Sequence, residues 1–185
     1  MEHFYQNLGE DWFTFPKLYS HVASTFADGS RFVEVGSWKG RSASYLAVEI
    51  INAGKDIKLF CVDTWQGSVE HESMACVKDD TLYKEFIINT EPVKDVIVPI
   101  RKASIDAAKT FADGSLSFVF IDASHVYEDV MQDLEAWYPK VAAGGIFAGH
   151  DYSWDANVAR AVFDWSKKNN VEIRETDEGC WITYK

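Results

Sequence analysis

The sequence has few cysteines and no long apolar run, and each shortage excludes a class of protein. Cys61, Cys76 and Cys180 are odd in number and lack the close spacing of a metal motif, which favours reduced thiols over a disulfide framework. No apolar stretch approaches the roughly 20 residues that span a bilayer, and no signal-peptide core opens the chain. We therefore expect a cytoplasmic protein without a membrane anchor.

Positive charge is also scarce. Lys and Arg number 18 against 29 Asp and Glu, which gives a net charge of −11. Nucleic acids and anionic membranes attract proteins through positive charge, so this balance disfavours both as partners. The 185 residues contain no internal repeat or low-complexity stretch. They predict a single domain over 1–185, in which an aromatic segment and a helix within 1–30 precede a core of 31–185.

Strand-like and helix-like patterns alternate along this core. Apolar runs predict strands near 32–35, 59–63, 96–100 and 117–121, and a short strand after the turn at 144–145. Apolar residues at three- and four-residue steps predict helices over 41–53, 126–141 and 157–168, and a shorter helix over 104–111. Two alternating segments near 171–175 and 180–184 predict a terminal hairpin. The alternation is typical of an α/β protein with a mostly parallel sheet and helices on both faces.

The first strand leads through a glycine turn into a helix. Gly36 allows a sharp turn and close approach of a ligand, and the N-terminus of the next helix is a natural seat for a carboxylate or phosphate. Asp63 ends the next strand, where an acid commonly binds the ribose of an adenosine-containing ligand. Nicotinamide dinucleotides and S-adenosylmethionine both fit this description. Trp38 stands where a dinucleotide fingerprint requires glycine, so the adenosyl ligand with an amino-acid tail is favoured.

Polar residues follow two later strands. Asp122 and His125 come after the strand at 117–121, and His150 and Asp151 end the strand that follows the turn at 144–145. The carboxyl ends of strands in an open α/β sheet form the edge where ligands bind, so these side chains should lie together. Carboxylates with one or two imidazoles can hold a divalent ion. We hypothesise a metal site at Asp122, His150 and Asp151.

In combination these motifs resemble class I S-adenosylmethionine-dependent methyltransferases. The similarity is to the catechol and caffeoyl-CoA O-methyltransferases and to the macrolide-sugar O-methyltransferase and cephalosporin-hydroxylase-like group. It covers 30–185 and rests on Glu34-x-Gly36-x-x-x-Gly40-x-Ser42, Lys102-Ala103-Ser104, Asp122 with His125, and His150-Asp151. The resemblance implies a Rossmann-like, mostly parallel seven-stranded sheet with a C-terminal antiparallel hairpin. It also implies methyl transfer to a hydroxyl of a small molecule.

The resemblance also implies roles for individual residues. Glu34 would meet the amine of the cofactor, Ser42 its carboxylate and Asp63 its ribose. His125 would accept the proton of the acceptor, while Asp122 orients the site or binds a metal. Most relatives carry an acid where His150 stands, and this departure leaves room for a softer ion or for no metal. The expected cofactor-binding residues are Glu34, Gly36, Ser37, Trp38, Ser42, Asp63, Trp65, Ser104 and Asp122.

Several alternatives stay open. The chain could be a non-catalytic module that binds the adenosyl ligand, a hydroxylase-like enzyme of similar fold, or an NAD-dependent oxidoreductase. The aromatic residues of 1–16 either cover an edge of the core or a partner in a homodimer, or they close over the acceptor. The segment 65–80 is predicted to be a long loop, of the length often used for lids or binding loops.

Overall fold

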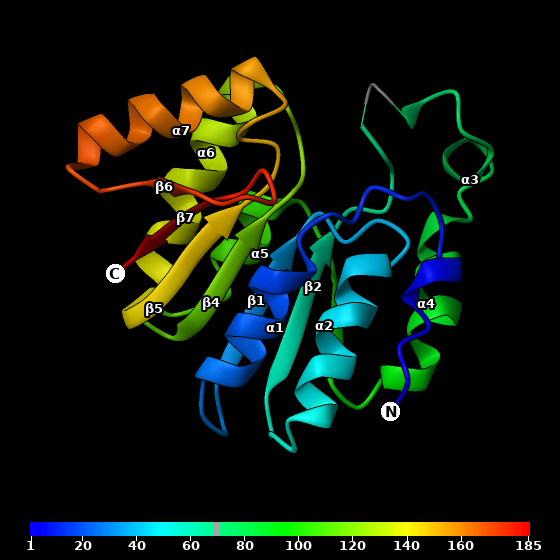
Figure 1. The fold of residues 1–185 in the computed structure, drawn as a ribbon. Coiled ribbons are helices and arrows are strands. Elements are labelled where there is room, and N and C mark those ends of the chain that lie inside the picture. The colour runs from blue at the N-terminus through cyan, green and yellow to red at the C-terminus, as the bar shows by residue number, and fades with distance from the viewer. Residues whose placement is uncertain (69–70) are drawn as a thin grey trace.

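The computed structural model describes residues 1–68 and 71–185, and over these residues seven strands form one sheet in the order β3-β2-β1-β4-β5-β7-β6 (Figure 1). The strands β1 to β5 are parallel, whereas β7 pairs antiparallel with β5 and with β6. This arrangement confirms the predicted fold and its terminal hairpin. The bounds are β1 Arg31–Val35, β2 Lys58–Asp63, β3 Ile97–Arg101, β4 Leu116–Ile121, β5 Val141–Gly149, β6 Arg174–Glu175 and β7 Trp181–Tyr184.

Helices cover both faces of the sheet because the central strands are apolar on both sides. In β1, Phe32 belongs to the core beneath one set of helices, and Val33 and Val35 belong to the core on the opposite face. The first set is α1 Pro16–Thr25, α2 Arg41–Asn52 and α4 Leu82–Thr90, and the second is α5 Ser104–Ala108, α6 Tyr127–Trp137 and α7 Ala156–Asn169. Side chains alternate along a strand, so Glu34 shares the face of Phe32 and points toward α1 and α2.

Some predicted bounds are wrong. The helix predicted to reach 141 ends at Trp137, because Pro139 stands in a 3-10 turn and Val141 already begins β5. The strand predicted at 171–175 shrinks to Arg174–Glu175. The predicted loop 65–80 contains the short helix α3 Ala75–Lys78, and its positions 69–70 lie outside the described residues. The sequence analysis also missed α4, where Leu82 and Phe86, four residues apart, face the core.

Backbone hydrogen bonds connect the carboxyl ends of the central strands. The Gly36 N–H donates to the Val62 carbonyl at 2.8 Å, and the Asp122 N–H donates to the Val35 carbonyl at 2.8 Å. The His150 N–H donates to Ile121 at 3.0 Å. The turns after β1, β2, β4 and β5 are thereby held at one edge of the sheet. None of the helices in the described residues is both long and apolar enough to cross a membrane.

Candidate functional site

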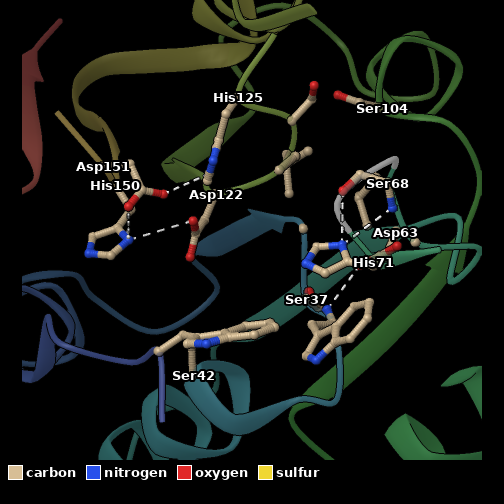
Figure 2. A pocket seen from close by; sticks show the side chains of 18 of the residues that line it. Ser37, Ser42, Asp63, Ser68, His71, Ser104, Asp122, His125, His150 and Asp151 are labelled. Atoms are coloured by element: carbon tan, nitrogen blue, oxygen red, sulfur yellow. Dashed lines mark hydrogen bonds and ion pairs between the residues drawn. The ribbon is translucent and has the colours of Figure 1, made fainter. Parts of the chain in front are cut away.

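A cavity of about 990 Å³ opens at this edge of the sheet. Its lining combines the turns after β1, β2, β3, β4 and β5 with the N-terminal segment. Figure 2 shows the two ends of the site, with Asp122, His125, His150 and Asp151 on one side and Asp63 and Ser104 on the other. Of the predicted site residues, those that line the cavity are Gly36, Ser37, Trp38, Ser42, Asp63, Ser104, Asp122, His125, His150 and Asp151.

The glycine of the first turn is required by the neighbouring turn. Gly36 has a φ of 88°, and a Cβ added there would lie 1.9 Å from the carbonyl oxygen of Asp122. The close approach that Gly36 permits is therefore that of the β4 end to the β1 end. Next to it, Ser37 is buried at the lining of the cavity, and its hydroxyl interacts with the Glu34 carboxylate.

Glu34 lies beneath the floor of the cavity and does not line it. Its side chain is 1% exposed, and its two oxygens accept hydrogen bonds from Tyr19 Oη at 2.7 Å and Ser42 Oγ at 3.1 Å. Burial raises the pKa of Glu34 to about 7, although these hydrogen bonds oppose the rise. The structure thus corrects the predicted direct contact, since Glu34 reaches the cavity through Ser42.

Asp63 organises two turns at the end of β2. Its Oδ2 accepts the Trp38 N–H at 2.9 Å, and its Oδ1 accepts the Trp65 N–H at 2.7 Å. Both tryptophans adopt a left-handed backbone, with φ of 45° and 52°, a conformation that needs such support. Burial raises the pKa of Asp63, and the backbone N–H donors oppose it.

Trp65 does not line the cavity, which corrects its predicted place among the cofactor-binding residues. Its indole is fully buried and packs against Tyr83 and Phe86 at ring distances of 4.8 and 4.7 Å. The indole N–H donates to the Trp38 carbonyl at 2.8 Å. Trp65 therefore holds the first turn in place from below.

Ser104 belongs to a network that the sequence did not reveal. It is the first residue of α5, and it donates its hydroxyl proton to Asp133 of α6 while accepting the Trp137 indole N–H at 2.8 Å. Asp133 is 6% exposed and lines the cavity beside Ser104. Burial raises the pKa of Asp133 to about 6. The one sequence signal was an acid placed between Val130 and Leu134, among the core positions of the predicted helix.

Two histidines and two aspartates meet at the opposite end. His125 Nε2 lies 2.9 Å from Asp151 Oδ2, and His150 Nδ1 lies 3.3 Å from Asp151 Oδ1 and 3.7 Å from Asp122 Oδ1 (Figure 2). Burial alone would lower the pKa of His150, but the two carboxylates raise it to about 9. For Asp151, burial alone would raise the pKa, but hydrogen bonds from both imidazoles hold that pKa well below its usual range. At neutral pH the cluster therefore contains an imidazolium between two carboxylates.

The donor set for a divalent ion differs from the predicted one. Among the described residues, the group whose ligand atoms lie within 4.8 Å of one another is Asp122, His125 and Asp151. Two carboxylates and an imidazole suit a hard or borderline cation. His150 is not part of this group, and its Nε2 lies 2.9 Å from Thr14 Oγ1.

The N-terminal segment forms one wall of the cavity. Glu10 accepts the Trp38 indole N–H at 2.8 Å and pairs with Lys39 at 3.0 Å. Trp12 is half exposed and lies 5.6 Å from the ring of His71 in the loop after β2. Phe15 is buried in the core, as the prediction of a covered core edge requires, whereas Trp12 and Thr14 line the cavity, and closure of this segment over an acceptor stays a prediction.

Comparison with known proteins agrees with this geometry. A family model described as a methyltransferase domain matches residues 33–152. The uncharacterized protein y4gI of Sinorhizobium fredii is 28% identical over 151 residues, which are 82% of this chain and only 14% of that protein. The fold resembles the O-methyltransferase NovP (TM-score 0.71, 18% identity, 92% of this chain and 78% of that one). It also resembles TomG of Streptomyces achromogenes, an O-methyltransferase solved with SAM (TM-score 0.63, 12% identity, 92% and 79%).

Proposed function

The chain belongs to the methyltransferase-domain family, and from this premise we propose that the protein transfers the methyl group of S-adenosylmethionine to a hydroxyl of a small molecule. The observation that carries the proposal is the single cavity that joins Ser42 and Asp63 at one end to His125 and Asp151 at the other. The first end would hold the cofactor, and the second end offers groups that can accept a proton in the same cavity. NovP and TomG, which are similar in fold, are O-methyltransferases, which supports an oxygen acceptor.

The cofactor end of the cavity offers a partner for each polar part of the ligand. The N-terminus of α2 and the hydroxyl of Ser42 would hold the carboxylate of the amino-acid tail. Glu34 would favour the ammonium from beneath through Ser42. Asp63 would accept the ribose hydroxyls.

His125 is the proposed base. Asp151 Oδ2 lies 2.9 Å from Nε2 of its ring and Asp155 Oδ2 lies 4.0 Å from Nδ1, so both carboxylates can orient the imidazole. The cofactor supplies an activated methyl group and a neutral thioether leaving group. His125 removes the proton of the acceptor hydroxyl as the oxygen bonds to the methyl carbon and the carbon–sulfur bond breaks. Because the methyl group is already activated, positioning and proton removal are the main tasks left to the protein.

A metal-assisted reaction is the second candidate, supported by the group of Asp122, His125 and Asp151. A divalent cation there would lower the pKa of the acceptor hydroxyl. His125 would then be a ligand and could not serve as the base. The two candidates therefore differ in what His125→Ala does to metal binding.

The net charge of −11 supports a small-molecule acceptor over nucleic acid or a membrane surface. A cytoplasmic location remains a proposal, as does a homodimer.

Calorimetry with S-adenosylhomocysteine tests the cofactor, with and without magnesium. Asp63→Asn should weaken binding about 10- to 100-fold through loss of charged hydrogen bonds, whereas Asp113→Asn at an exposed ion pair should not. Absence of binding by folded wild-type protein, or binding of NAD instead, would overturn the proposal.

Turnover is followed as S-adenosylhomocysteine formed with a panel of phenols. His125→Ala should abolish turnover and keep cofactor affinity, with His21→Ala as the exposed control. A cofactor-binding protein with no turnover on any phenol would favour the non-catalytic module, and a product without a new methyl group would favour the hydroxylase-like enzyme. Magnesium binding that disappears in His125→Ala would favour the metal candidate.

A further inference from the structure

We propose that Asp133 recognises the exocyclic amine of the adenine ring and thereby makes the cavity select an adenosyl ligand over its deaminated counterpart. This inference rests on the proposed function. It assigns a binding role to a residue outside the predicted site, on the helix between β4 and β5.

The position of the ring follows from the topology. The ribose is placed at Asp63 on β2, and the amino-acid tail lies toward β1 at Gly36 and Ser42. The ring must therefore extend away from β1, toward β3. The turn after β3 is held there, because the Lys102 N–H donates to the Asp63 carbonyl at 3.1 Å. This turn ends at Ser104, which brings the ring to the Ser104–Asp133 pair.

The direction of the hydrogen bonds makes Asp133 an acceptor. Ser104 Oγ accepts from Trp137 Nε1 at 2.8 Å. The single hydroxyl proton of Ser104 is then directed to Asp133 Oδ1. Among the described residues, Ser104 is the side chain that donates to Asp133, and no Lys, Arg or His lies within ion-pair distance of it. Burial raises the pKa of this carboxyl, as expected for a charge with too few donors.

A carboxylate that lines a cavity and accepts from a single serine hydroxyl keeps lone pairs for a hydrogen-bond donor on a ligand. The exocyclic amine of adenine is such a donor. Hypoxanthine carries a carbonyl oxygen at that place, which would face the carboxylate and be repelled. Asp133 thus favours adenine over hypoxanthine for two reasons. It accepts a hydrogen bond from the adenine amine, and it repels the hypoxanthine oxygen.

A purely architectural role is the alternative, in which the Ser104–Asp133 bond only ties the short helix α5 to α6. The nearby Asp129 provides a matched comparison. It lies one turn earlier on α6 and also lines the cavity, but it is exposed and accepts the Ser124 hydroxyl at 2.8 Å.

The test is calorimetry with S-adenosylhomocysteine and S-inosylhomocysteine on wild type, Asp133→Asn and Asp129→Asn. Wild type should bind the adenosyl ligand about 100-fold more tightly, since a site built for a donor rejects the analogue that lacks it. Asp133→Asn should reduce this ratio at least about 10-fold, because the amide can donate to the carbonyl oxygen. Asp129→Asn should keep the wild-type ratio.

Equal affinity of wild type for the two ligands would overturn the inference without any variant. An Asp133→Asn protein that weakens both ligands equally would show the architectural role instead. Both results leave the methyltransferase proposal standing, whereas failure of wild type to bind either ligand would end that proposal and this inference together.

Discussion

The buried carboxyl of Glu34 should give the free protein a stability that falls as pH rises. Its folded pKa of about 7 lies above the ordinary value of 4.5. The folded state therefore keeps a proton that the unfolded chain releases between those two pH values. Since the native state binds more protons in this window, the free energy of unfolding decreases with increasing pH.

The size of the effect follows from the shift. A difference of about 2.5 pKa units corresponds to about 3 kcal/mol, of which about 2.5 kcal/mol falls between pH 5 and pH 8. Glu34→Gln keeps the shape and a hydrogen-bonding oxygen but removes the titration. The difference in free energy of unfolding between wild type and this variant should change by that amount over the same range, with the variant gaining relative stability at high pH.

Urea denaturation followed by tryptophan fluorescence, in the absence of cofactor, measures both proteins at each pH. Subtracting the two curves removes the contributions of other titrating groups, including Asp133 and the histidine–aspartate cluster. Exposed Glu172→Gln serves as control and should follow wild type. Parallel curves for wild type and Glu34→Gln would refute the reasoning, because they would mean that Tyr19 and Ser42 stabilise the carboxylate as fully as water does.

Two further predictions concern the turns around the cavity. Gly36→Ala should destabilise the fold by at least about 3 kcal/mol in chemical denaturation, because a Cβ 1.9 Å from the Asp122 carbonyl adds to the cost of a positive φ. Gly29→Ala, with φ of 79° and open space around its Cβ, should cost only about 1 to 2 kcal/mol, and equal losses would contradict the clash. Thr14→Val should lower turnover about 5-fold by releasing His150 Nε2, with cofactor affinity unchanged, since one net hydrogen bond is worth about 1 kcal/mol. Thr25→Val, at an exposed hydroxyl, should leave both turnover and cofactor affinity unchanged. A loss of cofactor affinity in Thr14→Val would contradict this prediction, because it would place Thr14 at the cofactor end of the site.

The sequence predicted the groups at strand ends well because a strand end is a local feature. Asp63 and Asp122 directly follow apolar runs, Asp151 comes one residue later, after His150, and parallel strands must bring their carboxyl ends to one edge. The helix over 126–141 was extended too far for a similarly local reason. Val141 continues the helical spacing, and only pairing with β4 converts it into the first residue of β5.

For Glu34, the strand pattern and the family motif lead to different predictions. The motif predicts contact with the ligand, whereas the two-residue period of β1 places Glu34 on the face of Phe32, beneath α1 and α2. The period alone therefore indicates a buried carboxyl. Its partner Tyr19 lies 15 residues earlier, in a helix whose docking the pattern does not specify.

The environment of Asp133 could not be predicted from the local sequence, because its hydrogen-bond partner Ser104 lies 29 residues earlier. On the sequence it is an acid among the core positions of an amphipathic helix, a place where an unpaired charge would be costly. That conflict is itself a signal, since a local rule broken without a local compensation is typical of functional sites. The structure resolves it by setting the carboxyl at a cavity wall beside Ser104. An acid at a core position of a predicted helix therefore indicates a partner or a cavity contributed by residues far away in the sequence.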